Sequence, residues 1–451
     1  MQEESYKKAH RNLKVQFLEI MAKTMIEAML PELDLFEIPP TQLSVERVLK
    51  TEHRPTATLE GSNFFEFYVT SSADQYILIS ESQLRMNVAI LLEKTDRSAV
   101  SGDEWGAALP ANYLLHSMIK QLSICINDKE VNRDPQTYSY RAIMEAQLGC
   151  AKEVKDSLLT CALWYESEED RRKFLKQSEL DAGRSKNIDM IGNVHCDLGF
   201  LRKALPGGCT LKMRFTLHDP KFFLKLPANI SAKLVINEAT LYVSKLKVTH
   251  ELLSAHQKAL NVSPAKYFIT RCEVRQRTIA KGANNADIDN FVLTQMPRRA
   301  MVVCVKNRAF NGSYKDDPFY FDDFDISHIE CFIDGRSYPS SPYTPNFREG
   351  KYIREYHGFL DALCQNFTES TITFDRLRYQ MGNVMFGFNF ADDGSNGCGM
   401  NGHVNPIKRG SLGLKMMFRR PLDEAINVLM YCEFDNVIEI DKDHQVTTDY
   451  N

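Results

Sequence analysis

The side chains that could hold a metal ion are the histidines, here those from His116 to the end of the sequence, and the acidic residues. A two-sandwich metalloenzyme needs two or three histidines and a carboxylate converging on one metal. The histidines form no HxH or HExxH set: His116, His195, His218, His250, His256, His328, His357, His403 and His444. One acidic stretch matches no calcium loop in its spacing: Asp316, Asp317, Asp322, Asp323 and Asp325. We therefore predict no metal site, and the binding of an ion by the acidic stretch stays open.

Motifs for other chemistry do not occur in usable form. The glycine-rich stretch GSNGCGMNG at residues 394–402 lacks the GxxxxGK[ST] pattern of a phosphate loop, and the chain has no GxSxG elbow. The basic pairs Arg298-Arg299 and Arg419-Arg420 form no stripe, so we expect solvated turns and no sequence-specific nucleic-acid binding. These patterns predict no catalytic, cofactor-binding or metal-binding residues, no cofactor and no enzyme.

Length and composition are those of an ordinary globular protein. The 451 residues suffice for two cores, 25% are charged, 43% are hydrophobic and the net charge is −4. Eleven cysteines occur without CxxC pairs, which is typical of reduced core residues in a chain made in the cytosol. The sequence opens with no signal peptide and contains no apolar run of about 18 residues, so we expect neither secretion nor a membrane span.

An eleven-residue pattern that occurs twice suggests how the chain is organised. The first copy is QLSICINDKEV at residues 121–131, and the second is HIECFIDGRSY at 328–338, an offset of 328 − 121 = 207. Each has an apolar run of strand length followed by a corner, Asn127-Asp128 or Asp334-Gly335, whose residues tolerate left-handed backbone angles. Each is followed by a segment that we predict to be amphipathic, 138–148 and 352–363.

A second pair of matches supports a duplication. LKMRF at residues 211–215 is followed by LKMMF at 414–418, an offset of 414 − 211 = 203. Two matches in the same order with nearly equal offsets indicate a tandem unit of about 200 residues.

The elements around these repeats are mostly strands. We predict strands in the first unit at 64–68, 76–79, 86–92, 121–126, 189–201, 210–217 and 232–248. In the second unit we predict 267–280, 290–295, 300–306, 326–333, 384–390, 410–418, 425–434 and 436–440. Helices are expected at 5–30, within 138–180 and at 249–265. A polar loop holding Trp105 is expected at 95–111, and a loose polar tail after Ile440.

Seven motifs, in order along the chain, resemble the hexon-type capsid proteins of adintoviruses and Polinton (Maverick) elements. They are ELDLF at 32–36, IPPTQ at 38–42, ALWY at 162–165, DMIG at 189–192, AFNGSYK at 309–315, YIREY at 352–356 and EFDNVIEID at 433–441. They span nearly the whole chain from Glu32, and the segment before Glu32 lies outside the resemblance.

The resemblance implies a mainly β fold of two tandem eight-stranded jelly-roll sandwiches (a double jelly roll) with helical insertions and an N-terminal helix. The boundaries would be an N-terminal arm at 1–31, a first jelly roll at 32–248, a helical connector at 249–265, a second jelly roll at 266–441 and a polar tail at 442–451. The arm packs either on a neighbouring subunit or on its own domain, and the sequence favours neither.

The function implied is that of a structural major capsid protein of a virus or virus-like transposon. Its partners would be two further copies in a pseudo-hexameric homotrimer, neighbouring capsomers and a penton or minor capsid protein. It would reside in the virion capsid and be made in the host cytoplasm, with the nucleus as a candidate place of assembly. Two alternatives stay open: a double-sandwich enzyme, either a bicupin or a glycan amidase, and a domesticated host protein with a capsid fold. Host, capsid size and receptor are not encoded in these patterns.

Overall fold

The computed structural model describes residues 41–450 apart from 60, 134–135, 180–182, 364–369, 393 and 395–405. The chain divides into two compact units, Met1–Leu43 and Ser44–Asn451, and the fold below is that of the second unit. The helix predicted at 5–30 lies outside the described residues, as does nearly all of the glycine-rich stretch at 394–402.

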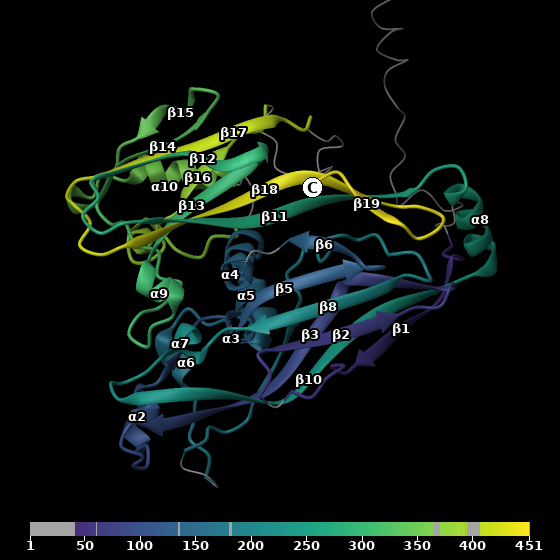
Figure 1. The fold of residues 1–451 in the computed structure, drawn as a ribbon, viewed down its shortest axis with the longest axis horizontal. Coiled ribbons are helices and arrows are strands. Elements are labelled where there is room, and N and C mark those ends of the chain that lie inside the picture. The colour runs from purple at the N-terminus through teal and green to yellow at the C-terminus, as the bar shows by residue number, and fades with distance from the viewer. Residues whose placement is uncertain are drawn as a thin grey trace, which may run out of the picture. The chain divides into compact units, whose positions relative to one another are not determined.

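Two β-sandwiches follow each other along the second unit (Figure 1). In the first sandwich, one sheet has the order β1 (Val45–His53), β10 (Ile230–Val248), β3 (Gln75–Lys94), β7 (Ile188–Asn193). The facing sheet has the order β2 (Phe64–Thr70), β8 (Thr210–Leu217), β5 (Ile119–Ile126), β6 (Lys129–Arg133). We call these strands the first roll.

The second roll repeats this arrangement. One sheet has the order β11 (Ala265–Ile279), β18 (Ile426–Ile440), β13 (Arg299–Lys306), β16 (Phe386–Asn389), and β19 (Val446–Thr448) also pairs with β18. The facing sheet has the order β12 (Asn285–Gln295), β17 (Arg409–Phe418), β14 (Ile326–Ile333), β15 (Arg336–Tyr343). In each roll the first strand pairs with the last, and the second with the last but one, which is jelly-roll connectivity. The mainly β, double jelly-roll prediction is therefore confirmed.

The repeated sequence pattern occupies the same place in both rolls. Residues 121–131 lie on β5, its corner and β6, and residues 328–338 lie on β14, its corner and β15. Both corners are two-residue turns with left-handed backbone at each position: φ is 47° and 66° at Asn127 and Asp128, and 49° and 77° at Asp334 and Gly335. Residues of this type adopt such angles at least cost, so the predicted hairpins form.

Strand pairing shows how closely the two rolls correspond. Ile119 lies opposite Leu217 and Ile326 lies opposite Phe418, and each pair is followed by a bulge at the next position. Equivalent residues of β5 and β14 are therefore 326 − 119 = 207 positions apart in sequence, and those of β8 and β17 are 418 − 217 = 201 apart. The LKM match, with its offset of 203, lies on equivalent strands but two residues out of register. A shift of two residues leaves each side chain on the same face of the sheet. The two sequences can therefore look alike although the matched residues do not occupy equivalent positions.

The connection after the corner contains helices in both rolls. In the first roll these are α4 (Tyr138–Gly149), α5 (Lys152–Asp156), a 3-10 turn at Leu158–Ala162 and α6 (Glu168–Arg172). In the second roll they are α10 (Ile353–Ala362) and α11 (Arg376–Tyr379). Helix α10 is amphipathic as predicted, whereas α4 is buried on nearly every side because it lies between the two rolls. The amphipathic prediction is wrong for α4.

Shorter elements fill the remaining connections. They are α2 (Gly102–Ala107), β4 (Leu109–Pro110), α3 (Leu114–Ser117), α7 (Pro220–Phe223), β9 (Leu224–Lys225), α8 (His250–Leu260), α9 (Asn307–Asn311) and a 3-10 turn at Phe347–Glu349. Helix α2 replaces the predicted polar loop: Ser101 and Glu104 form a reciprocal capping box, and Trp105 is buried. Strand β4 pairs with β9.

Several predicted strand boundaries are wrong, and the strand expected at 290–295 already begins at Asn285. Residues 425–434 and 436–440 form one strand, β18, and 76–79 with 86–92 form one strand, β3. The strand expected at 189–201 ends at Asn193. In β18 the polar pair Asp435-Asn436 looked like a break, but both residues are buried and their neighbours bind them. The division at 31, 248, 265 and 441 stays a prediction.

Candidate functional site

Three of the five residues of the acidic stretch pair with arginines: Asp316, Asp317 and Asp325. Arg348 binds Asp325 at 2.7 Å, and Arg420 and Arg419 lie 3.5 and 3.9 Å from the same carboxylate. Arg308 pairs with Asp316 at 2.8 Å, and Arg171 lies 3.6 Å from Asp317. Within the described part of the chain, no group of three or more His, Cys, Asp or Glu side chains is placed to hold a metal ion.

Two of the scattered histidines meet in the core. The rings of His116 and His195 lie 4.7 Å apart and edge-on, at the inner end of α4. His195 Nε2 lies 2.9 Å from the Tyr113 hydroxyl, and His116 Nδ1 lies 3.0 Å from the Tyr138 hydroxyl. Burial is the main reason why the pKa of His116 lies well below its usual value, and the nearby His195 lowers it further. His116 is therefore a neutral core residue.

A buried ionic network centred on Arg141 of α4 joins these histidines to both rolls. Arg141 Nε donates to Glu145 Oε1 at 2.7 Å, and Nη2 donates to Asp197 Oδ1 at 2.7 Å. Glu145 Oε2 lies 2.8 Å from His195 Nδ1. The Arg141 side chain is completely buried, so its charge depends on these partners.

The two carboxylates of the network differ in their pKa. Burial opposes ionisation of Glu145, but Arg141 and the bond with His195 outweigh it and lower the pKa. At Asp197 burial dominates the attraction of Arg141 and raises the pKa. Arg141 therefore favours the charged form of both carboxylates, and burial opposes it more effectively at Asp197 than at Glu145.

The same residues cover the free edge of β11 in the second roll. Arg141 Nη1 donates to the carbonyl of Cys272 at 3.3 Å, and Thr137 Oγ1 donates to the carbonyl of Val274 at 3.1 Å. The backbone N–H of Cys272 donates to Asp197 Oδ1 at 3.0 Å. An uncovered strand edge is a site for pairing with another chain. The first roll therefore seals this edge with side chains and fixes the second roll beside itself.

The residues after β18 form a second link between the rolls. Asn127, at the corner of the first roll, donates to the carbonyl of His444 at 2.8 Å. The Tyr450 hydroxyl donates to the carbonyl of Val131 at 2.7 Å, and the Tyr450 ring lies over Arg271. With β19 paired to β18, this tail is ordered, so the expectation of a loose tail is wrong. One bond thus runs from a tail side chain to the backbone of the first roll, and the other from a first-roll side chain to the backbone of the tail.

The pair Arg298-Arg299 is buried beside β18, so the prediction of a solvated turn is wrong. Glu433 binds Arg298 at 2.8 Å and Arg299 at 2.5 Å, and Asp435 lies 3.2 Å from Arg298. The two arginines are thus neutralised by carboxylates of β18, which is distant in the sequence. At Arg419-Arg420 the structure agrees better with the prediction, since Arg420 is largely exposed.

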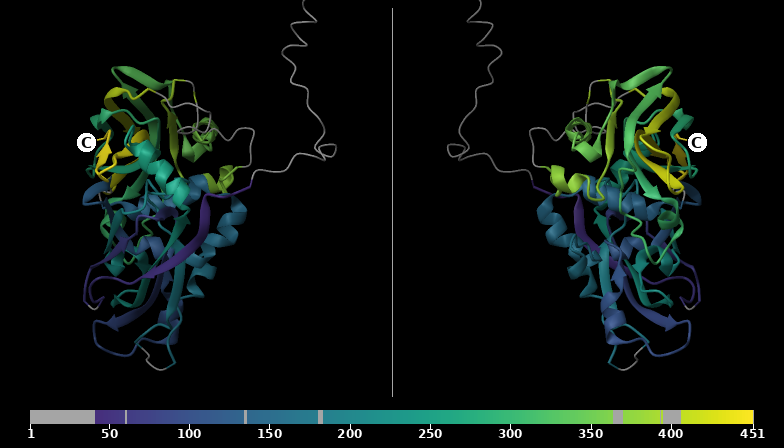
Figure 2. Two further views of the ribbon diagram at one scale, coloured as in Figure 1. Left: turned by 90° about the vertical axis from the view of Figure 1, so that its right-hand side faces the viewer. Right: turned by 90° about the vertical axis from the view of Figure 1, so that its left-hand side faces the viewer.

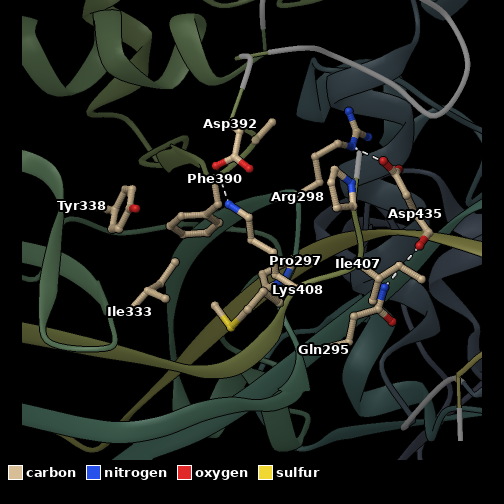
Figure 3. Close-up of a pocket in the computed structure, with 13 residues that line it drawn as sticks. Gln295, Pro297, Arg298, Ile333, Tyr338, Phe390, Asp392, Ile407, Lys408 and Asp435 are labelled. Carbon is tan, nitrogen blue, oxygen red and sulfur yellow. Dashed lines mark hydrogen bonds and ion pairs between the residues drawn. The ribbon is translucent and has the colours of Figure 1, made fainter. Parts of the chain in front are cut away.

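A small pocket next to these arginines is shown in Figure 3. Its volume is about 80 Å³, well below the several hundred Å³ typical of small-molecule sites. Its polar groups pair with each other: Gln295 Nε2 donates to the carbonyl of Asp435, and Lys408 forms an ion pair with Asp392. The described residues that line this pocket therefore provide packing and charge neutralisation.

The sequence analysis did not predict Arg141 and Glu145, the residues at the centre of the buried ionic network. Arg141 and Glu145 have the i, i+4 spacing of a helix pair, which is common on exposed surfaces. The useful signal was their setting: most of the other residues of the helix are Tyr, Ile, Met, Ala or Leu, and a charged pair buried among such residues needs buried partners.

Known proteins share the fold of this chain. No family model matches the sequence. An uncharacterized protein of Caenorhabditis elegans is 23% identical over 339 residues, which is 74% of this chain and 80% of that protein.

Among solved structures, a chain of the Sputnik virophage matches with a TM-score of 0.62 at 10% identity, covering 94% of this chain and 93% of that chain. The faustovirus major capsid protein matches with a TM-score of 0.59 at 8% identity, covering 92% and 93%. The mavirus major capsid protein matches with 0.55 at 10% identity, covering 94% and 95%. The fold is that of double jelly-roll capsid proteins. In the described part of the chain, no helix is long and apolar enough to span a bilayer.

Proposed function

We propose that this chain is a major capsid protein of hexon type, from a virus or a virus-like transposon related to adintoviruses and Polinton elements. The observation that carries the proposal is the pair of sandwiches with one strand order, fixed side by side by the Arg141 network. Such a block presents two similar corners of a hexagon. The virophage, faustovirus and mavirus chains match it over nearly their whole length.

In this proposal the protein acts by assembly and not by catalysis. Three copies form a pseudo-hexameric capsomer, capsomers join into an icosahedral shell, and a penton or minor capsid protein closes the vertices. The protein is then located in the virion capsid, after synthesis in the host cytoplasm and assembly there or in the nucleus. Support comes from the paired charges of Arg141, Glu145 and Asp197 at the contact with β11, which fix the two rolls to each other.

The proposed division of the chain is 1–31 as an arm, 32–248 and 266–441 as jelly rolls, 249–265 as a connector and 442–451 as a tail. Deleting Met1–Leu30 should leave folding intact and weaken contacts between capsomers. Loss of soluble protein on this deletion would instead make the segment part of the core.

A second candidate is a domesticated host protein that keeps the capsid fold. The relative in Caenorhabditis elegans favours it, because the sequence similarity extends over most of both chains. Such a protein would share the assembly surfaces and differ in what it encloses.

Sedimentation velocity and electron microscopy of the purified full-length chain test the proposal. We expect trimers at micromolar concentration, and sheets or shells at higher concentration. A chain that stays monomeric at micromolar concentration contradicts the capsid function.

A further inference from the structure

The contact between the two rolls within one chain provides a pattern for contacts between chains. In this contact α4, which follows the hairpin of the first roll, covers the free edge of β11, the first strand of the second roll. The tail that follows β18, the last strand of the second roll, binds the corner of the first roll at Asn127. Each partner has a counterpart in the other roll, because both rolls have the same strand order.

Strand β1 is the counterpart of β11, and its residues 47–53 are open along one edge. Cys272 and Val274 on β11 are 7% and 1% exposed, whereas Val48 in the middle of β1 is 61% exposed. Strand β1 pairs with β10 along one edge. In the described part of the chain, no hydrogen bond from another element reaches the backbone of residues 47–53 along the opposite edge. An open edge strand carrying an exposed Val is a site for another protein surface.

Helix α10 is the counterpart of α4, and its outer side is also open. Ile353, at the start of α10, is 42% exposed. His357 and Asp361 form an i, i+4 pair at 2.8 Å on the exposed side of the helix. Helix α4 uses a pair of the same spacing, Arg141 and Glu145, within the contact that covers β11.

Helix α8 takes the place of the tail, since it follows β10 as the tail follows β18. It has no fully buried residue, and Val262 just beyond it is 88% exposed. The backbone N–H of Thr249, just before α8, donates to the carbonyl of Ser44, just before β1, at 3.1 Å. Strand β1 and α8 therefore form one continuous surface, which we call the β1/α8 face.

We infer that the β1/α8 face of one copy binds the α10 side of the second roll of another copy, with α8 against the corner at Asp334-Gly335. This inference rests on the proposed capsid function and names the surfaces that its assembly uses. Helix α10 would cover the free edge of β1 and bury Ile353 against Val48. Each contact between chains then repeats the contact that α4 and the tail make within a chain.

The two faces lie at different ends of the molecule. Figure 1 shows α10 on the left in the second roll, and β1 with α8 on the right. In the left panel of Figure 2 the side carrying α8 is turned to the viewer. A contact between unlike faces is heterologous, and it builds a closed ring when the rotation closes. Three copies with two rolls each give six similar contacts.

Single substitutions at exposed positions test the two faces separately. Val48→Asp alters the β1/α8 face, and Ile353→Asp alters the α10 face. Leu293→Asp on β12 is the matched control, since Leu293 is 49% exposed and lies on neither face. Circular dichroism and thermal midpoints establish that each variant folds, and sedimentation velocity measures its assembly.

We expect Val48→Asp and Ile353→Asp each to weaken trimer formation at least about tenfold, with Leu293→Asp unchanged. An equimolar mixture of the two disabled variants retains one intact pair of faces and should form a heterodimer that goes no further. A trimer that survives either substitution overturns this pairing of faces and leaves the capsid function standing. A wild-type chain that is monomeric at micromolar concentration overturns the capsid function itself.

Discussion

Helices α4 and α10 occupy the same place in two rolls of the same topology, yet one is buried and the other is half exposed. In α4 the pair Arg141–Glu145 is buried among Asp197, His195 and the edge of β11. In α10 the pair His357–Asp361 lies in solvent. The difference shows that a neighbouring roll covers this place in the first roll and not in the second, and the sequences of the two helices match their surroundings. The first roll already has its neighbour, and the second roll still offers the equivalent surface.

The variant with the largest expected effect on stability is Arg141→Met. It leaves Glu145 and Asp197 buried without their cation, so we expect a loss of about 3 to 5 kcal/mol in unfolding free energy. Thermal or urea unfolding measures it. His357→Ala on α10 is the control and should cost less than about 1 kcal/mol, because an exposed pair contributes little. Equal losses in the two variants would contradict the comparison.

The tail that joins the rolls gives the next largest effect. Truncation after Lys442 removes β19 and the bonds from Asn127 to His444 and from Tyr450 to Val131. At about 0.5 to 1.5 kcal/mol for each bond, the loss should be about 1 to 3 kcal/mol. Hydrogen exchange of residues 126–131 should accelerate most. Tyr450→Phe removes one bond and should show roughly half the effect, whereas unchanged exchange would rule out the link.

Lys155 tests the contact between the two helical insertions through its pH dependence. Its Nζ donates to the carbonyl of Gln147 in the first roll and of Thr371 in the second, and burial lowers its pKa to about 8. In the unfolded chain the pKa is about 10.4, so the folded state loses the proton first as pH rises. Wild type should therefore gain stability over Lys155→Met between about pH 8 and about pH 10, by at most about 1.4 kcal/mol per pH unit.

Thermal midpoints of both proteins from pH 7 to pH 10 measure this gain. The comparison with Lys155→Met removes contributions from other groups that titrate in the same range. A constant difference between the two midpoints would mean that the Lys155 ammonium is hydrated in the folded state.

The smallest expected effect distinguishes the two hairpin corners. Gly335 has φ of 77°, and its counterpart Asp128 has φ of 66°. Nothing lies within 4 Å of a Cβ added at Gly335, so Gly335→Ala adds only backbone strain, about 1 kcal/mol. Asp128→Gly should be neutral or slightly stabilising, because it relieves the same strain. Urea midpoints of the two variants should move in opposite directions or, for Asp128→Gly, not at all.

Local patterns predicted the repeated strands and their corners well. Leu122, Ile124, Cys125 and Ile126 form an apolar run of strand length that ends at Asn127-Asp128, so strand and turn follow from adjacent residues alone. The same rules located the strand at 326–333 and its corner. Such features depend on alternation and on permitted backbone angles, which neighbouring residues determine.

Features that depend on distant partners were not predictable in this way. Asp435-Asn436 looked like a strand break and Arg298-Arg299 like a surface turn, yet Asp435 and Arg298 bind each other, and Arg271 binds Asn436 at 2.9 Å. A buried charge needs a partner, and that partner is often far away in the chain. The Arg141 network and the tail were missed for this reason.

The bond between Val131 and Tyr450 also determines when, during synthesis, the two rolls can be fully joined. These residues are 319 positions apart, so a ribosome working at about 5 to 20 residues per second needs on the order of 15 to 60 s to get from one to the other. During that interval the first roll lacks the bond from Tyr450, although β11, whose Cys272 carbonyl binds Arg141, is made well before its end. The two rolls can therefore be joined completely only after Tyr450 has left the ribosome, which places this contact late in the folding of the chain.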